Sequence, residues 1–168
     1  MLLHCTQKLA AKLPEIMATP LAESSPLGSW HAHLITIDRR LCVLFCHDES
    51  RYVLFQPGLV KADFAELGRL HRELFLSSLV ALGVKETYLK RVALALGPVR
   101  FDCATDRSVL GSLRVASSDL DGLLYRLVNV MECDFLALSV SLNDRPITVM
   151  GKWSFPDKVM LERIERLC

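Results

Sequence analysis

The stretch that decides the fold is Gly28–Phe55, which reads GSWHAHLITIDRRLCVLFCHDESRYVLF. Within it, "WHAHLITI" (30–37) alternates as a half-buried strand does, and "LCVLFCH" (41–47) is apolar on both faces. "YVLFQ" (52–56) follows the polar turn "DESR". The stretch therefore predicts a three-stranded antiparallel β-meander over about 30–57, with its middle strand buried on both sides.

Outward from the meander, the chain mixes short strands with helices. Strands are predicted near 2–5, 99–104 and 134–142, the last because "DFLALSVSLN" places alternate apolar residues on one face. Helical spacing predicts a helix from Lys61 to Leu82, and further helices are predicted in 7–13, 85–96, 105–131 and 156–167. We expect an α+β fold: a single two-layer domain with a mainly antiparallel sheet and helices packed on one face.

The longest irregular segment is "PEIMATPLAESSPLG" (14–28). Proline, serine and glycine cluster there and no hydrophobic period survives. Long loops of this kind in compact domains often serve as lids or binding loops. A lid or a ligand-binding loop could lie in this segment.

Length and composition limit the class of protein. The 168 residues suit one ordinary domain, and 51% of them are hydrophobic, which predicts a thick core or a face buried in a homodimer. No run reaches the roughly 18 apolar residues that cross a bilayer, and the first residues lack the pattern of a secretory leader. We expect a cytoplasmic protein with no membrane contact.

The distribution of charged residues and the spacing of cysteines limit the class of protein further. The 20 basic and 19 acidic residues are interleaved, without the basic stripe typical of nucleic-acid binding. The six cysteines form no C-x-x-C pair, so we expect free thiols that are mostly buried, with Cys168 exposed at the terminus.

A metal site in the meander depends on the length of its first turn. His31 and His33 share one strand face. An even turn (Arg39-Arg40, or 38–41) sets His33 opposite Cys46 and His31 opposite Asp48, a ligand set that suits zinc. An odd turn sets His33 opposite Phe45 or His47 and disperses the set, because a one-residue slip exchanges strand faces.

Two other interpretations of these residues are alternatives to a zinc site. In one, His31 and His33 are polar residues at a solvated strand end, and the nearby cysteines simply fill a buried strand. In the other, Cys46 is a nucleophile paired with His33 or His47, although apolar surroundings raise a thiol pKa and oppose this role. Because tight zinc-ligand pairs are absent, we expect no cofactor, with zinc as the alternative.

Four further residues are candidates for binding. Arg107 and Ser108 begin a predicted helix and, with its backbone amides, could hold an anion; the alternative is a capped, packed helix. Arg39 and Arg40 at the hairpin tip could contact a partner, or belong to a solvated turn in which Asp38 orders its own backbone.

Two aromatic residues have both a functional and a packing interpretation. Trp30 could be a platform on which a ligand stacks, but a core side chain at the start of its strand is favoured. His71 lies on the apolar side of its helix, where we expect a core histidine rather than a general base.

Several segments resemble a bacterial family labelled only as a domain of unknown function. The segment 27–64 is similar to its L-G-D-W-H-A-N-L, T-I-D-R-R-K-C-V-L-F and P-G-hydrophobic-K-A-D/E-F motifs. The segments 5–13, 105–113 and 141–146 ("CTQKLAAKL", "TDRSVLGSL" and "SLNDRP") are similar to further motifs in the same order. The chain departs at His33, where the family has asparagine, and at Arg114-Val115, where it has N-D. The resemblance implies a bacterial, intracellular, single-domain protein and assigns no chemistry.

The sequence therefore favours a non-enzymatic binding or regulatory module that acts through protein contacts, with a second copy or another protein as partner. The alternative is a small metal-dependent or Cys/His hydrolase centred on His31, His33 and Cys46.

Overall fold

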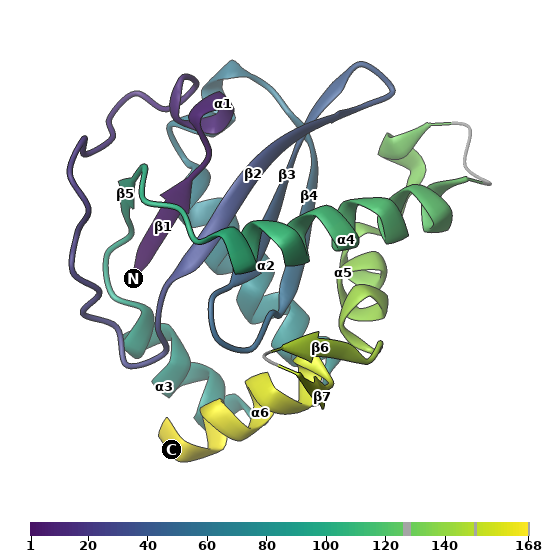
Figure 1. The fold of residues 1–168 in the computed structure, drawn as a ribbon. Helices are drawn as coiled ribbons and strands as arrows, with labels where there is room; N and C mark the ends of the chain where they lie inside the picture. The colour runs from purple at the N-terminus through teal and green to yellow at the C-terminus, as the bar shows by residue number, and fades with distance from the viewer. Residues whose placement is uncertain (126–128, 150, 168) are drawn as a thin grey trace.

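The computed structural model describes residues 1–125, 129–149 and 151–167 of an α+β chain. Its centre is a five-stranded sheet in the order β4-β3-β2-β1-β5 (Figure 1). The strands are β1 (Leu2–Cys5), β2 (Trp30–Ile37), β3 (Arg40–His47), β4 (Val53–Leu59) and β5 (Arg100–Asp102). The predicted meander is confirmed as β2–β4, and the strands expected near 2–5 and 99–104 are present as β1 and β5.

The sheet is mixed rather than mainly antiparallel. The meander strands pair antiparallel, but β1 pairs parallel with both β2 and β5. Parallel neighbours need a crossover connection. The long segment from β1 to β2 is one such crossover. The segment after β4, which contains helices α2 and α3, brings the chain back to the sheet as β5, on the opposite side of β1 from β2.

Helices and a small hairpin complete the described chain. The α-helices are α1 (Gln7–Ala10), α2 (Leu67–Ala81), α3 (Glu86–Leu96), α4 (Arg107–Leu124), α5 (Phe135–Asn143) and α6 (Pro156–Leu167). Lys61–Phe64 and Val130–Glu132 are 3-10 turns (η1 and η2), and β6 (Ile147–Val149) pairs with β7 (Lys152–Ser154). The helix predicted over 61–82 is thus divided into η1 and α2. The expectation that Cys168 is exposed lies outside the described residues.

Helices cover both faces of the sheet, so the expected two-layer packing on one face is wrong. Along β3, Val43 and Phe45 face one core with α2, α3 and α6, whereas Leu44 and Cys46 face a second core with α4. In Figure 1, α4 crosses in front of the sheet and α2 lies behind it. The reason is visible in "LCVLFCH": a strand that is apolar on both faces needs cover on both.

The strand predicted at 134–142 is wrong, because this segment forms α5 beside β4. The Asp134 side chain accepts a hydrogen bond from the Ala137 backbone N–H and caps the helix. One turn apart, Ser139 and Asn143 point at the free edge of β4, where the Phe55 N–H donates to Ser139 Oγ (3.0 Å). Leucines in "FLALSVSLN" alternate as in a strand, but helical spacing alone brings both polar side chains to that edge.

None of the helices in the described part of the chain is long and apolar enough to cross a membrane.

Candidate functional site

The first turn of the meander is even in length, but the register of the two strands is shifted by two residues from the one that would gather a zinc site. Asp38 and Arg39 both have positive φ (48° and 62°), which a two-residue hairpin turn of type I′ requires. The resulting register sets His31 opposite Cys46, and His33 opposite Leu44. His31, His33 and Cys46 therefore share a face, but the predicted pairings of His33 with Cys46 and of His31 with Asp48 are wrong. The odd register is wrong as well.

His33 and Cys46 do not come together as reactive groups. His33 Nδ1 lies 3.3 Å from Thr6 Oγ1, and burial lowers the pKa of His33. The Cys46 thiol is fully buried, and burial raises its pKa to about 12. Across the described residues, no group of three or more His, Cys, Asp and Glu side chains is arranged to hold a metal ion. The zinc hypothesis has no such ligand group to support it.

We predict that Cys46 resists alkylation in the folded protein. Iodoacetamide attacks the thiolate, so at pH 8 Cys46 should react at least about 100-fold more slowly than exposed Cys103. Peptide mass spectrometry after timed labelling measures both rates. Rapid labelling of Cys46 without unfolding would restore the nucleophile hypothesis.

His31 and Asp48 do meet, although they are not opposite each other in the ladder. His31 Nδ1 lies 2.6 Å from Asp48 Oδ1, and the Asp106 backbone N–H donates to His31 Nε2 (2.8 Å). Because Nε2 accepts a hydrogen bond, the ring proton lies on Nδ1 and is donated to Asp48. Burial acts to raise the pKa of Asp48, but hydrogen bonds from His31 and Ser29 outweigh it and hold this pKa below its ordinary value.

Two partners in this cluster were missed by sequence reasoning. His4 on β1 lies beside His31, with ring centroids 4.9 Å apart, and its Nδ1 lies 2.6 Å from Asp102 Oδ1. His4 Nε2 lies 3.7 Å from Asp48 Oδ2. The fully buried Asp102 also accepts the backbone N–H of Leu21. The only signal was a histidine in one apolar strand and an aspartate in another, because the parallel pairing of β1 with β2 and β5 joins distant segments.

Trp30 and His71 belong to the core. Trp30 is fully buried, and its ring lies 4.6 Å from that of His71 and 5.0 Å from that of Phe75. Among the described atoms, neither ring nitrogen of His71 has a hydrogen-bond partner, and burial lowers its pKa to about 3. His47 is equally buried, and its pKa is lowered to about 4. The packing interpretations of Trp30 and His71 fit these contacts.

These buried histidines predict a loss of stability in acid. The unfolded chain takes up a proton near the ordinary histidine pKa of 6.5, whereas folded His47 and His71 stay neutral until pH falls to about 4 and about 3. Stability is therefore present above pH 6.5 and lost below it, by about 2 kcal/mol per histidine between pH 8 and pH 5. Urea unfolding of His71→Phe should show a shallower loss with acid than the unsubstituted protein, and an unchanged slope would contradict the prediction.

The arginines singled out in the sequence are exposed. Arg39 and Arg40 lie at the hairpin tip, and Arg107 lies in the first turn of α4. In one of the two interpretations Asp38 orders its own turn, but its carboxylate instead accepts the Val130 N–H at 2.7 Å. Ser108, the fourth of these predicted binding residues, contacts a buried side chain: its hydroxyl accepts a hydrogen bond from Arg51 Nη2 at 2.9 Å.

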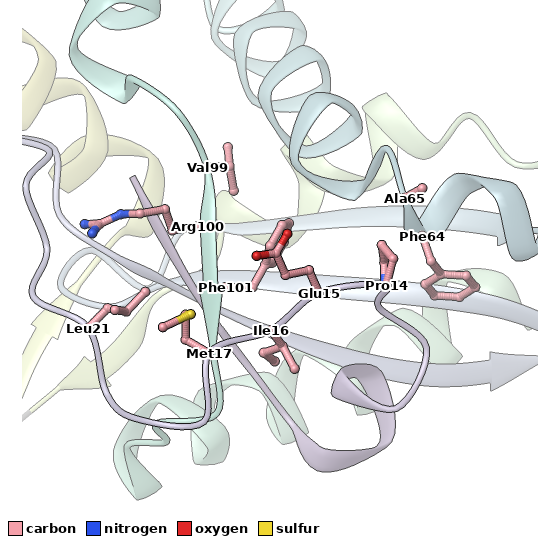
Figure 2. A pocket seen from close by; sticks show the side chains of 10 residues that line it. All are labelled: Pro14, Glu15, Ile16, Met17, Leu21, Phe64, Ala65, Val99, Arg100 and Phe101. Carbon is pink, nitrogen blue, oxygen red and sulfur yellow. The ribbon is translucent and has the colours of Figure 1, made fainter.

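The long 14–28 loop runs round the β1–β5 edge of the sheet (Figure 1). Part of it lines a cavity of about 530 Å³ (Figure 2). Backbone and side-chain hydrogen bonds attach this loop to β5. The Met17 N–H donates to Phe101 O (3.0 Å), the Leu21 N–H to Asp102 Oδ2 (2.8 Å), and Arg100 Nη2 to Ala22 O (2.7 Å). The cavity walls are therefore held in place before any ligand enters.

Apolar side chains dominate the cavity lining. It consists of Pro14, Glu15, Ile16, Met17, Leu21, Phe64, Ala65, Val99, Arg100 and Phe101. Glu15 and Arg100 are its charged groups, and Figure 2 shows side chains from the loop, β5 and the end of η1 around one space. A cavity of this size with few polar groups has the character of a small-molecule site.

Comparison with known proteins places the chain in a family. The family model described as "Domain of unknown function (DUF6933)" matches residues 2–159. A comparison with curated proteins gives no match. The match covers nearly the whole chain, and it confirms the predicted resemblance to an uncharacterised domain family. The chain belongs to the DUF6933 family.

Proposed function

We propose that the protein is a non-enzymatic binding module that holds a small, largely apolar molecule between the 14–28 loop and β5. The observation that carries this proposal is the 530 Å³ cavity, whose lining is apolar except for Glu15 and Arg100. Burial of apolar ligand surface would supply most of the affinity, at roughly 25 cal/mol for each Å² removed from water. The two charged side chains would orient a polar end of the ligand.

Pre-organisation supports the same conclusion. Met17, Leu21 and Ala22 are each hydrogen-bonded to β5, so the loop has little freedom left to lose when a ligand enters. The carboxylate that holds Leu21 is itself held by His4, and it is fully buried. The His4–Asp102 pair therefore has a positioning role for the loop.

The chemistry of the cavity favours binding over hydrolysis. Its lining holds no histidine, cysteine, serine or threonine among the described residues that form it. The groups expected to act in a hydrolase lie elsewhere: both ring nitrogens of His31 are hydrogen-bonded, and Cys46 is buried with a pKa of about 12. The expected protein partner, a second copy of the chain or another protein, stays a prediction.

A neutral fluorescent probe tests the proposal. N-Phenyl-1-naphthylamine fluoresces when it leaves water, and we expect saturable binding to the folded protein. Ala65→Phe introduces a ring at the cavity wall and should weaken the probe at least about tenfold. Ala62→Phe is the matched control, since Ala62 in η1 is also exposed but does not line the cavity. Absence of saturable binding, or equal affinity in both variants, would contradict the proposal.

A further inference from the structure

A second cavity, of about 380 Å³, lies between α4 and the β6–β7 hairpin. It is lined by Arg51, Val53, Ser108, Gly111, Ser112, Val115, Arg145, Pro146, Ile147, Thr148 and Trp153. Unlike the cavity beside β5, it has two guanidinium groups and several hydroxyl groups. Its polar lining calls for a ligand of a different chemistry.

Arg51 is the unusual group in this cavity. Only 7% of its surface is exposed, yet its two hydrogen-bonded nitrogens donate to uncharged oxygens, the Asp48 carbonyl (2.5 Å) and Ser108 Oγ (2.9 Å). Its Nε is buried and has no hydrogen-bond partner among the described atoms. Within the described chain no carboxylate forms an ion pair with it. A buried charge without a counter-charge is destabilising, so the guanidinium favours an anion beside it.

The second arginine of the cavity is already neutralised. Arg145 forms an ion pair with Asp119, and its Nε donates to the Leu142 carbonyl at 3.0 Å. The Asp48 carboxylate is also occupied, by His31 and Ser29. One positive charge, that of Arg51, is therefore left to be balanced by a ligand.

The lining of the cavity includes two exposed apolar side chains. Trp153 on β7 is 76% exposed, and Val115 on α4 is 52% exposed. Large apolar side chains so exposed beside a cavity are suited to cover the planar part of a ligand. A planar ring would remove this surface from water while its acidic group lies deeper.

We propose that this cavity binds a small molecule composed of an oxyanion and a planar ring. The oxyanion, a carboxylate or a phosphate, lies against Arg51 and the Ser108 hydroxyl. Each Arg51 Nη group has a second N–H besides the one that donates to Asp48 O or Ser108 Oγ, and the Ser108 hydroxyl keeps its own proton to donate. The ring lies against Trp153. This site is separate from the cavity beside β5, and neither depends on the other.

Gly111 makes the site testable without disturbing the fold. It lines the cavity on α4, and a Cβ added there meets nothing within 4 Å. Gly111→Leu should therefore fill cavity space while the helix keeps its contacts. Gly122→Leu is the matched control: it lies on the same helix with equally open space and does not line the cavity.

Benzoate, phenyl phosphate and inorganic phosphate serve as probes in calorimetric titrations at low salt. We expect saturable binding of benzoate or phenyl phosphate that is at least about tenfold weaker in Gly111→Leu and unchanged in Gly122→Leu. Whichever of benzoate and phenyl phosphate binds more tightly identifies the acidic group as a carboxylate or a phosphate. Emission of Trp153 should change with binding; the chain has two tryptophans, and buried Trp30 should not respond.

Arginine variants provide a second readout. Arg51→Lys keeps the charge but loses the guanidinium N–H groups, so probe affinity should fall. Arg107→Ala removes an exposed charge outside the cavity and should leave probe affinity unchanged. The proposal is wrong if neither ring-bearing probe binds, or if Gly111→Leu binds them as tightly as the unsubstituted protein.

Discussion

Replacing Asp102 by alanine is expected to lower the free energy of unfolding by about 3–5 kcal/mol, because a buried hydrogen-bond donor that loses its acceptor costs about 1–3 kcal/mol and Asp102 serves three donors. The Asp102 side chain is fully buried and accepts hydrogen bonds from His4 Nδ1 (2.6 Å) and the backbone N–H groups of Leu21 (2.8 Å) and Ala104 (3.1 Å). Alanine would leave three donors without an acceptor. Urea unfolding followed by far-ultraviolet circular dichroism measures the change.

The same substitution should weaken binding of the neutral probe, because Leu21 belongs to the cavity wall and loses its attachment. Asp102→Asn keeps one acceptor oxygen and should lie between alanine and the unsubstituted protein. Asp121→Ala, on the exposed side of α4, is the control and should change stability by less than about 0.5 kcal/mol. If Asp102→Ala were as stable as Asp121→Ala, the buried pair would not hold the loop.

Asn143→Ala is expected to destabilise the protein by about 3 kcal/mol, since each buried backbone group left unpaired costs about 1–3 kcal/mol. The Val53 N–H donates to Asn143 Oδ1 at 2.7 Å, and Asn143 Nδ2 donates to the Val53 carbonyl at 2.7 Å. This one side chain thus satisfies both backbone groups of a residue on the outer edge of β4. Chemical unfolding of the variant measures the loss.

Ser141→Ala is the control for this prediction, because Ser141 is exposed on the same helix. Asn143→Asp keeps an acceptor for the Val53 N–H but offers no donor to the Val53 carbonyl. Its loss of stability should therefore lie between those of Ser141→Ala and Asn143→Ala. Exposed strand edges also template pairing with other chains. We expect Asn143→Ala to aggregate at lower protein concentration, and equal stability of the Asn143 and Ser141 variants would contradict the role given to α5.

Local pattern was enough to predict the meander and most helices. The alternation in 30–37 and the doubly apolar 41–47 run require a central strand pair, and the two apolar faces of β3 explain the two cores. That second consequence was available from the sequence, and the one-sided packing expected there was an error of inference. The 134–142 segment is different: its leucines suit either period, and the pairing of Asn143 with Val53 is a long-range contact that no local pattern contains.

The cluster formed by His4, His31, Asp48 and Asp102 was predicted only in part, for a similar reason. Spacing placed His31 and His33 on one face, but Asp38 and Arg39 take positive φ and form the turn, which shifts the register by two residues from the predicted one. His4 and Asp102 join the cluster through parallel pairing across distant segments, which cannot be read from spacing. Composition identified the 14–28 loop as a segment where a lid or binding loop could lie, whereas its cavity depends on attachments to β5 that only the fold supplies.

The most direct test of the proposed binding function is where the neutral probe lies. Nuclear Overhauser effects between N-phenyl-1-naphthylamine and the methyl groups of the protein report this position at close range. We predict contacts to the Met17 and Ile16 methyl groups and to Val99, which line the cavity beside β5. Contacts confined to exposed apolar residues elsewhere, such as Leu94 on α3, would contradict the proposed site.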